Sequence, residues 1–365
     1  MTVTRVREIA AQLRAGFEAA GASPIETRIL LPADTLLDLY GEDIRARAYV
    51  TSDALRGEQM LRPDFTVPIV LAHVESGAHE GCYAYAGEVF RRQENSLERP
   101  NEYFQVGLEL IGSAQAIPAE TRVFSEIYMA VRPYNLRSAI GDIGLLAAAV
   151  SGLQTTERRK RALTRHIWRP ARFRALIDRF SGRVALPVSR AALLAASEPM
   201  SKATPMIGLR SRDEIATRIE ALREDAKTEP LSVTEVDALD ALLEVRAPAD
   251  QALALLRDIS AELPAISGAL DRMEARLEAL SQRDIEIGKL EFEASYGRTQ
   301  MEYYDGFVFG FYDATRPDQP PVAGGGRYDA LTRQIGQGRE IPAVGGVIRP
   351  DFLVSQGDTF GRDAS

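Results

Sequence analysis

The chain has 365 residues, of which 45% are hydrophobic and 26% are charged, a composition typical of a globular protein of about two domains. It carries 44 Lys and Arg against 52 Asp and Glu, and the net charge of −8 argues against general binding to a nucleic-acid backbone. Cys82 is the only cysteine, which excludes an intramolecular disulfide. The three histidines, His73, His79 and His166, lack the spacing of a metal site, so no metal is expected.

Neither a signal peptide nor a membrane span is expected. The first residues lack the apolar core of a signal peptide. No run of about 18 apolar residues is present to cross a bilayer. These features predict a soluble, cytoplasmic protein with no membrane partner and no nucleic-acid partner.

Apolar spacing and prolines define the first predicted elements. Apolar residues recur every three or four positions from Val6 to Phe17, which predicts an amphipathic helix. Weak alternation from Ile25 to Leu31 predicts a strand that ends at Pro32. Residues 33–44 favour a short helix with a long polar loop behind it.

The next segment is divided by Pro63. A strand is predicted to end at this proline, and Asp64 or Thr66 can cap a helix that runs through Val74. Both candidate caps have side-chain oxygens that accept hydrogen bonds from the first backbone N–H groups of a helix.

Two strands, residues 82–90 and 102–111, are predicted to pair antiparallel across a charged loop. In the second strand, Gln105 and Glu109 lie four positions apart and therefore on the same face. This face is polar inside an otherwise apolar run, and the pattern by itself favours a sheet surface that is open to solvent.

The composition changes between residues 151 and 282, where Ala, Leu, Arg and Glu dominate and glycine is scarce. We predict an all-helical insertion there. Further strands are predicted over residues 138–143, 285–292, 303–312 and 343–347. Because strands from both ends of the chain must then join one mostly antiparallel sheet, we predict an α+β core of residues 1–150 and 283–365.

Three segments are candidates for binding, and each also has a purely structural explanation. Arg91 at the end of a strand suits a phosphate or carboxylate, since guanidinium binds such anions bidentately. Tyr303 and Tyr304, placed on a predicted strand, pack a core or line a small-ligand pocket. The glycines 324–326 predict either a tight turn into a helix or a close approach of the backbone to a ligand.

Taken in order, these segments resemble the core of a class II aminoacyl-tRNA synthetase, and most of all that of the histidyl-tRNA synthetases. The resemblance implies an antiparallel sheet flanked by helices, with the helical insertion at the expected place. The matching segments are motif 1 at 29–32, the Leu-Arg-Pro-Asp-Phe-Thr segment at 61–66, motif 2 at 90–112, the histidine-specific segments at 303–304 and 325–329, and the entry to motif 3 at 342–345.

The sequence departs from these synthetases where ATP is handled. The motif 3 arginine that holds the ATP phosphates falls near Phe352, and Arg349 lies three residues too early. The motif 2 glutamate falls on Gln93. The catalytic arginine falls on Thr299, with Arg298 one residue away.

The positions that surround the amino acid are retained. The resemblance implies a histidine site made by Asp64, Thr66, Gln105, Glu109, Tyr303, Tyr304 and Arg327. A site that keeps its amino-acid contacts and loses its transition-state charges is expected to bind without catalysing, so no catalytic residue and no cofactor are predicted. Twelve residues follow Leu353, which predicts that the anticodon-binding domain of the synthetases is missing.

This combination resembles the synthetase-like regulatory subunits of ATP phosphoribosyltransferase, the first enzyme of histidine biosynthesis. The resemblance implies a partner, the short-form catalytic subunit, which this chain would activate and subject to histidine feedback. Motif 1 further implies a homodimer within a hetero-oligomer.

Two alternatives remain open. One is an active histidyl-tRNA synthetase-like enzyme that forms an adenylate, for which only Arg91 remains in register as a phosphate ligand. The other is an amino-acid-binding scaffold for a different partner.

Overall fold

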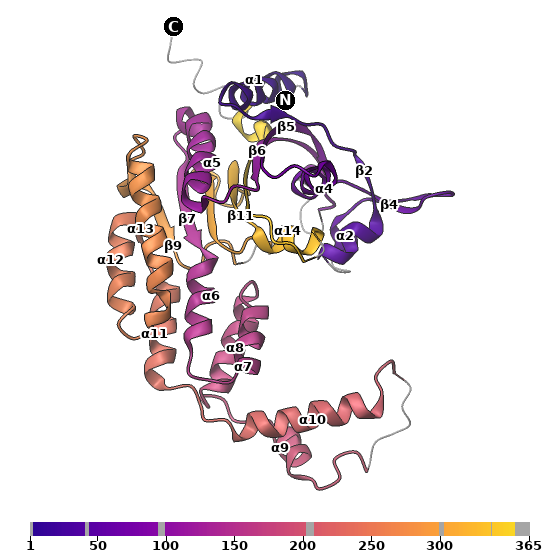
Figure 1. Ribbon diagram of the computed structural model, residues 1–365, viewed down its shortest axis with the longest axis vertical. Coiled ribbons are helices and arrows are strands. Elements are labelled where there is room, and N and C mark those ends of the chain that lie inside the picture. The colour runs from indigo at the N-terminus through magenta and orange to yellow at the C-terminus, as the bar shows by residue number, and fades with distance from the viewer. Residues whose placement is uncertain are drawn as a thin grey trace.

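The computed structural model describes residues 3–40, 44–93, 99–201, 208–298, 303–336 and 338–354 (Figure 1). Its centre is a nine-stranded sheet in the order β1-β5-β6-β12-β11-β10-β7-β9-β8. The pairs β1–β5 and β7–β9 are parallel and the other neighbours are antiparallel. The strands are β1 (Ser23–Pro24), β5 (Gly81–Phe90), β6 (Glu102–Ile111), β7 (Arg137–Asp142), β8 (Arg246–Pro248), β9 (Glu291–Glu293), β10 (Phe307–Tyr312), β11 (Ala323–Arg327) and β12 (Ala343–Ile348).

Strands from both ends of the chain alternate in this sheet, as the α+β prediction requires. β6 pairs with β12, and β7 pairs with β10. The antiparallel pairing of β5 with β6 is also confirmed, with Gly81 opposite Ile111 and Phe90 opposite Glu102. The mostly antiparallel sheet therefore joins residues more than two hundred positions apart.

A second, three-stranded sheet corrects two predictions near the N-terminus. It consists of β2 (Leu30–Pro32), β4 (Gly57–Leu61) and β3 (Val50–Asp53). The single strand predicted from Ile25 to Leu31 is wrong, because β1 adds to the large sheet and β2 to the small one. The polar loop predicted behind residues 33–44 contains α3 (Ile44–Arg47) and the β3–β4 hairpin instead.

Helices cover both faces of the large sheet. On one face lie α1 (Val3–Ala19), where Arg7 pairs with Glu88 of β5, and α5 (Ala116–Val131), whose Ile127 packs over Gly346 of β12. On the opposite face lie α4 (Thr66–Ser76) and α14 (Asp329–Ile335) (Figure 1). The N-cap position of α4 is Phe65, which has no side-chain capping bond, but the preceding Asp64 accepts a hydrogen bond from the Val67 N–H of the first turn at 3.5 Å.

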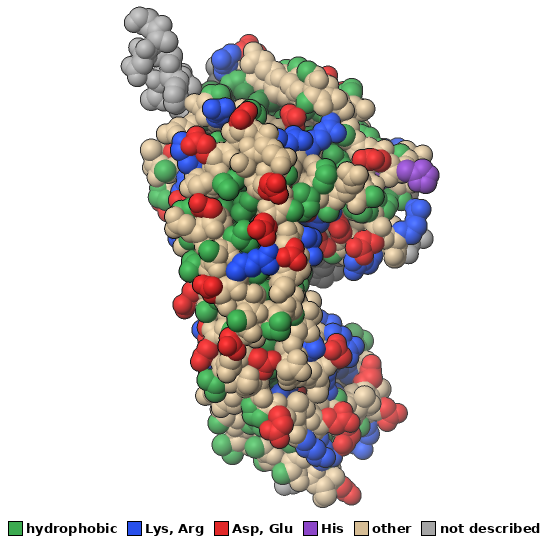
Figure 2. Space-filling model, turned by 60° about the vertical axis from the view of Figure 1, so that its left-hand side comes forward, with side chains coloured by type: hydrophobic (Ala, Val, Ile, Leu, Met, Phe, Trp, Pro, Cys, Tyr) green, Lys and Arg blue, Asp and Glu red, His purple; other side chains and the backbone are tan. Residues whose placement is uncertain are grey.

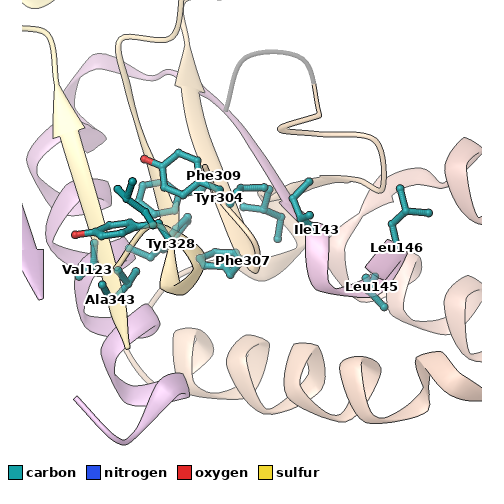
Figure 3. Packing of buried hydrophobic residues seen from close by; sticks show 14 of the residues in the cluster. Val123, Ile143, Leu145, Leu146, Tyr304, Phe307, Phe309, Tyr328 and Ala343 are labelled. Carbon is teal, nitrogen blue, oxygen red and sulfur yellow. The ribbon is translucent and has the colours of Figure 1, made fainter. Parts of the chain in front are cut away.

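Alternating phenylalanines hold α5 on the sheet. Phe307, Phe309 and Phe311 occupy every second position of β10 and so share one face. The ring of Phe124 on α5 lies 5.1 to 5.9 Å from all three ring centroids. Figure 3 shows Phe307 and Phe309 among the packed side chains of the core.

Among the described residues of the predicted insertion, 151–201 and 208–282, the regular elements are helices except for β8, which extends the edge of the large sheet. α13 packs against α5, whereas α9 and α10 lie farthest from the sheet, at the bottom of Figure 1. The molecule narrows on one side above these helices, and acidic and basic side chains are interspersed on the face in Figure 2. The helices are α2 (Ala33–Tyr40), α6 (Ile143–Gly152), α7 (Glu157–Arg165), α8 (Pro170–Phe180), α9 (Val188–Ala195), α10 (Arg212–Lys227), α11 (Val233–Glu244), α12 (Ala249–Ile259) and α13 (Ser267–Ser281).

Two features are absent from the described residues. None of the helices in this part of the chain is long and apolar enough to cross a membrane. Within the same residues, no group of three His, Cys, Asp or Glu side chains is placed to hold a metal ion.

A buried chain of ion pairs joins the insertion to the sheet. Glu120 on α5 accepts from Arg276 of α13 at 2.7 Å and from Arg327 of β11 at 2.5 Å. Arg276 also pairs with Asp142 at 3.0 Å, and Arg327 with Asp329 at 3.0 Å. All but Asp329 are less than a tenth exposed, so each charge depends on its partners for stabilisation.

We expect Glu120→Ala to lower the free energy of unfolding by about 3 kcal/mol or more, because two buried guanidinium groups would lose a carboxylate. The matched control is Glu274→Ala on α13, which removes one partner of an exposed pair with Arg257 and should cost less than about 1 kcal/mol. Urea unfolding of the two variants measures both values. Equal losses would show that the buried chain adds no more stability than a surface ion pair.

Candidate functional site

The polar face of β6 is buried. Gln105 and Glu109 are 3% and 2% exposed, because α4 and α14 cover this side of the sheet. The expectation from the pattern by itself, a face open to solvent, is therefore wrong. Period-two alternation identifies which residues share a face, but not whether another layer covers that face.

Both carboxylate oxygens of Glu109 accept hydrogen bonds from hydroxyl groups. The Thr66 hydroxyl donates to Oε1 at 2.9 Å, and the Tyr328 hydroxyl donates to Oε2 at 2.5 Å. Thr66 is the first residue of α4, and Tyr328 directly precedes α14. Glu109 thus sits between the sheet and the two helices that cover it.

Glycines on the neighbouring strands make room for these side chains. Gly345 of β12 is directly opposite Glu109, and a Cβ at this position would lie 1.5 Å from Glu109 Oε2. Gly107 is opposite Tyr85, and a Cβ there would lie 2.6 Å from the Tyr85 hydroxyl. Only glycine permits so close an approach of a side chain to the adjacent backbone.

Aromatic rings surround the carboxyl group. The ring centroids of Tyr303 and Tyr304 are 4.5 Å apart, and each lies 6.2 Å from that of Tyr328. Figure 3 shows Tyr304 beside Tyr328. Tyr303 and Tyr304 precede β10, which starts at Phe307, so the prediction that they lie on a strand is wrong. Burial, together with the charge of Asp64, raises the pKa of Tyr303 to about 12.

Asp64 and Arg91 stand at the edge of this group. Arg91 Nε donates to the carbonyl oxygen of Pro63 at 2.7 Å, and its Nη2 lies 3.8 Å from Asp64 Oδ2. Gln105 is buried on the same strand as Glu109. We refer to Asp64, Thr66, Gln105, Glu109, Tyr303, Tyr304 and Tyr328 as the Glu109 cluster.

The structure does not bring Arg327 to the cluster. Its guanidinium donates to Glu120 and Asp329, and its Nη2 donates to the Ala116 carbonyl oxygen at 3.2 Å. The preceding Gly326 faces Tyr304, so Arg327 points to the opposite side of the strand. Glycines 324–326 themselves lie in β11, which is paired on both sides, and the turn predicted there is wrong.

Two further arginines, Arg349 and Arg298, donate to main-chain carbonyl oxygens outside the cluster. Arg349 Nη1 donates to the Pro321 carbonyl oxygen at 2.9 Å, and its guanidinium lies over the Tyr103 ring. Arg298 Nε donates to the Ile167 carbonyl oxygen at 2.8 Å. Thr299 lies outside the described residues.

Burial raises the pKa of Glu109 from its ordinary value of 4.5 to about 8, and the two hydroxyl donors offset only part of this effect. The nearby charge of Asp64 raises it further. At neutral pH the carboxyl group is therefore mostly protonated, and a cation placed against it would displace the proton.

Sequence reasoning missed Tyr85, Tyr328 and Gly345 as parts of this site. Tyr328 lies inside the quoted histidine-specific segment, but nothing local shows that its hydroxyl reaches a residue on β6. Gly345 lies in the quoted entry to motif 3. The register of β12 against β6 decides its role, and no single segment reveals that register.

We expect Glu109→Gln to flatten the pH dependence of stability. The folded-state pKa of about 8 exceeds the ordinary 4.5, so the protonated carboxyl stabilises the fold most at low pH, and this contribution is lost as the pH rises through 8. Between pH 5 and 8, the free energy of unfolding of the variant should therefore rise relative to that of the wild type by up to about 1.4 kcal/mol per pH unit. Urea unfolding at each pH tests this, with exposed Glu102→Gln on the same strand as the control. Parallel curves for wild type and Glu109→Gln would contradict it.

Comparison with known proteins places the chain among synthetase-like proteins. The sequence model of the family described as histidyl-tRNA synthetase matches residues 1–198 and 213–353. Solved structures with the same fold include an ATP phosphoribosyltransferase regulatory subunit/histidyl-tRNA synthetase from Bacillus halodurans (TM-score 0.68, 22% identity, 97% of this chain and 79% of that one). A histidyl-tRNA synthetase from Nostoc matches with a TM-score of 0.62 at 16% identity, over 98% of this chain and 72% of that one.

Curated relatives can be aligned with this chain over nearly their whole length. Proteins from Brucella ovis and Brucella abortus are 30% identical to this chain over 374 aligned positions, which cover 97% of this chain and 98% and 97% of theirs. Both are named ATP phosphoribosyltransferase regulatory subunit. The chain therefore belongs to the family of ATP phosphoribosyltransferase regulatory subunits, which shares the histidyl-tRNA synthetase fold.

Proposed function

We propose that this protein is the non-catalytic partner of a short-form ATP phosphoribosyltransferase catalytic subunit. In this proposal it binds histidine at the Glu109 cluster, activates the catalytic subunit and transmits histidine feedback to it. The observation that carries the proposal is the contrast between two parts of the site. The amino-acid side of the cluster is assembled and buried, whereas the arginines near it are bound to main-chain oxygens or to acidic residues.

That contrast favours binding over catalysis. An enzyme that forms an adenylate stabilises the charge on transferring phosphates with preorganised cations. Arg298 and Arg349 each donate to a backbone carbonyl oxygen, and Arg91 is held by Pro63 and lies near Asp64. An ATP–pyrophosphate exchange assay with histidine should therefore give no turnover, and measurable exchange would support the synthetase alternative.

The chemistry of the cluster suits a histidine molecule. The ligand's ammonium or imidazolium group would pair with Glu109 and Asp64, both of which are less than a tenth exposed. The amide of Gln105 can donate to or accept from an imidazole nitrogen. Tyr303 and Tyr304 provide ring faces, which attract a cation when it is removed from water.

The small sheet offers a surface for self-association. Ile29 directly precedes β2 and Leu30 begins it, and the two residues are 44% and 46% exposed. We propose that this apolar edge forms the two-fold interface of a dimer, the commonest closed symmetry among oligomers. The dimer would then bind catalytic subunits to form the hetero-oligomer.

The cluster is connected to the helical insertion by a direct hydrogen bond. The indole N–H of Trp168 donates to the main-chain carbonyl oxygen of Tyr304 at 3.1 Å. A histidine molecule that displaces Tyr304 would therefore shift the turn between α7 and α8. Tenfold inhibition requires histidine to prefer one of two complex states by only about 1.4 kcal/mol, which one hydrogen bond can supply.

We expect histidine binding to release a proton at neutral pH, because the ligand's cation displaces the proton from Glu109. Calorimetry at pH 7 in buffers of different ionisation enthalpy should detect this release, and it should vanish above about pH 9, beyond the Glu109 pKa of about 8. Glu109→Ala should weaken binding by about 2–4 kcal/mol, while exposed Glu102→Ala serves as the control. Undiminished affinity in Glu109→Ala would refute the assignment.

Feedback should depend on the Tyr304 hydroxyl. We expect Tyr304→Phe to weaken histidine inhibition in the reconstituted complex without abolishing activation, since the ring remains in place. Tyr312→Phe is the matched control, because that hydroxyl bonds to Tyr296 outside the cluster. The assay is phosphoribosyl transfer across a histidine titration, with light scattering to report the assembly. If Tyr304→Phe and Glu109→Ala complexes are inhibited like the wild type, the effector site lies elsewhere.

A further inference from the structure

Arg298 holds a buried guanidinium group that is only partly satisfied by its surroundings. The residue is 4% exposed, and its Nε donates to the Ile167 carbonyl oxygen. Within the described residues this is its only hydrogen bond, and Nη2 is buried without an acceptor. A guanidinium has five N–H donors, and a buried charged donor without an acceptor is destabilising.

Next to this guanidinium lies a cavity of about 190 Å³ in the helical part of the molecule. Its wall is mainly apolar and includes Phe173 and Ile177 of α8 and Leu243 of α11. Arg298 itself lies over the Phe173 ring, 4.9 Å from its centroid. An apolar cavity of about 150 Å³ is sufficient to hold benzene, so this one can take a body of that size.

The charges around the cavity differ between its inner end and its rim. Burial lowers the pKa of Arg298 to about 10 with no carboxylate to offset it, so the group stays cationic at neutral pH. On α11, Asp240 pairs with Arg174 and Arg183, and Glu244 is exposed. Because Asp240 is neutralised by its arginine partners, the buried Arg298 is the cationic group in the wall that a ligand with one negative charge would match.

We propose that this cavity binds a small monocarboxylate, whose carboxylate group bonds to Arg298 and whose apolar body fills the space between α8 and α11. The carboxylate would accept from the guanidinium of Arg298, which lines the cavity and makes one hydrogen bond to the described residues. The site is separate from the Glu109 cluster, because Arg298 turns toward α8 and not toward Glu109.

Trp168 offers a local readout of this site. It is the only tryptophan in the chain, and it directly follows Ile167, which accepts the Arg298 hydrogen bond. We expect titration of the full-length protein with phenylacetate to change Trp168 fluorescence in a saturable way. Phenylacetamide, which has the same shape without the charge, should bind at least tenfold more weakly.

Two variants test the two halves of the proposal. Arg298→Gln should weaken phenylacetate binding at least tenfold. Leu243→Phe should abolish phenylacetate binding, because the larger side chain fills the cavity while Arg298 is unchanged. This variant tests the proposal even if Arg298→Gln fails to fold. Leu255→Phe on α12, at a side chain that is 48% exposed, is the control and should bind normally. Absence of saturable binding to the wild type, or unchanged affinity in Leu243→Phe, would overturn the proposal.

Discussion

The rest of the structure depends on one buried carboxylate, Glu120, which holds two guanidinium groups from distant parts of the chain. Arg276 belongs to the last helix of the insertion, and Arg327 ends the central strand β11. Neither charge is stable in an apolar interior without its partner. The insertion is therefore fastened to the sheet at the point where α5 crosses it, and Arg327 is held on the side of the sheet away from the Glu109 cluster.

A second constraint acts on the opposite face. Glu109 can lie flat against the sheet only because Gly345 stands directly across from it, and its hydroxyl partners come from the two helices that close that face. The same arrangement recurs where Tyr85 covers Gly107. Glycines on the neighbouring strands thus make room for the large polar and aromatic side chains opposite them on this face.

These two constraints together separate binding from catalysis in this fold. The residues that would recognise an amino acid converge on one carboxyl group whose pKa burial raises to about 8. The arginines that could have served a phosphate donate to groups of the protein itself. Arg327 donates to Glu120, Arg349 to the Pro321 carbonyl oxygen, and Arg298 to the Ile167 carbonyl oxygen. The indole of Trp168, in the turn between α7 and α8, is hydrogen-bonded to the main chain of Tyr304 in the cluster.

Sequence reasoning succeeded where local patterns are strong: it predicted the β5–β6 pair, β12, helices between residues 151 and 282, and the family resemblance that the ordered motifs carry. It failed where long-range contacts decide the outcome. Glycines 324–326 form a central strand and not a turn, because β10 and β12 pair on both sides and no local signal shows this. Three further features likewise depend on which layer covers which face of the sheet. They are the burial of Gln105 and Glu109, the hydrogen bond from Tyr328 to Glu109, and the position of Arg327 on the face away from the cluster. Only the tertiary structure decided them, because periodicity specifies the faces of a strand but not their neighbours.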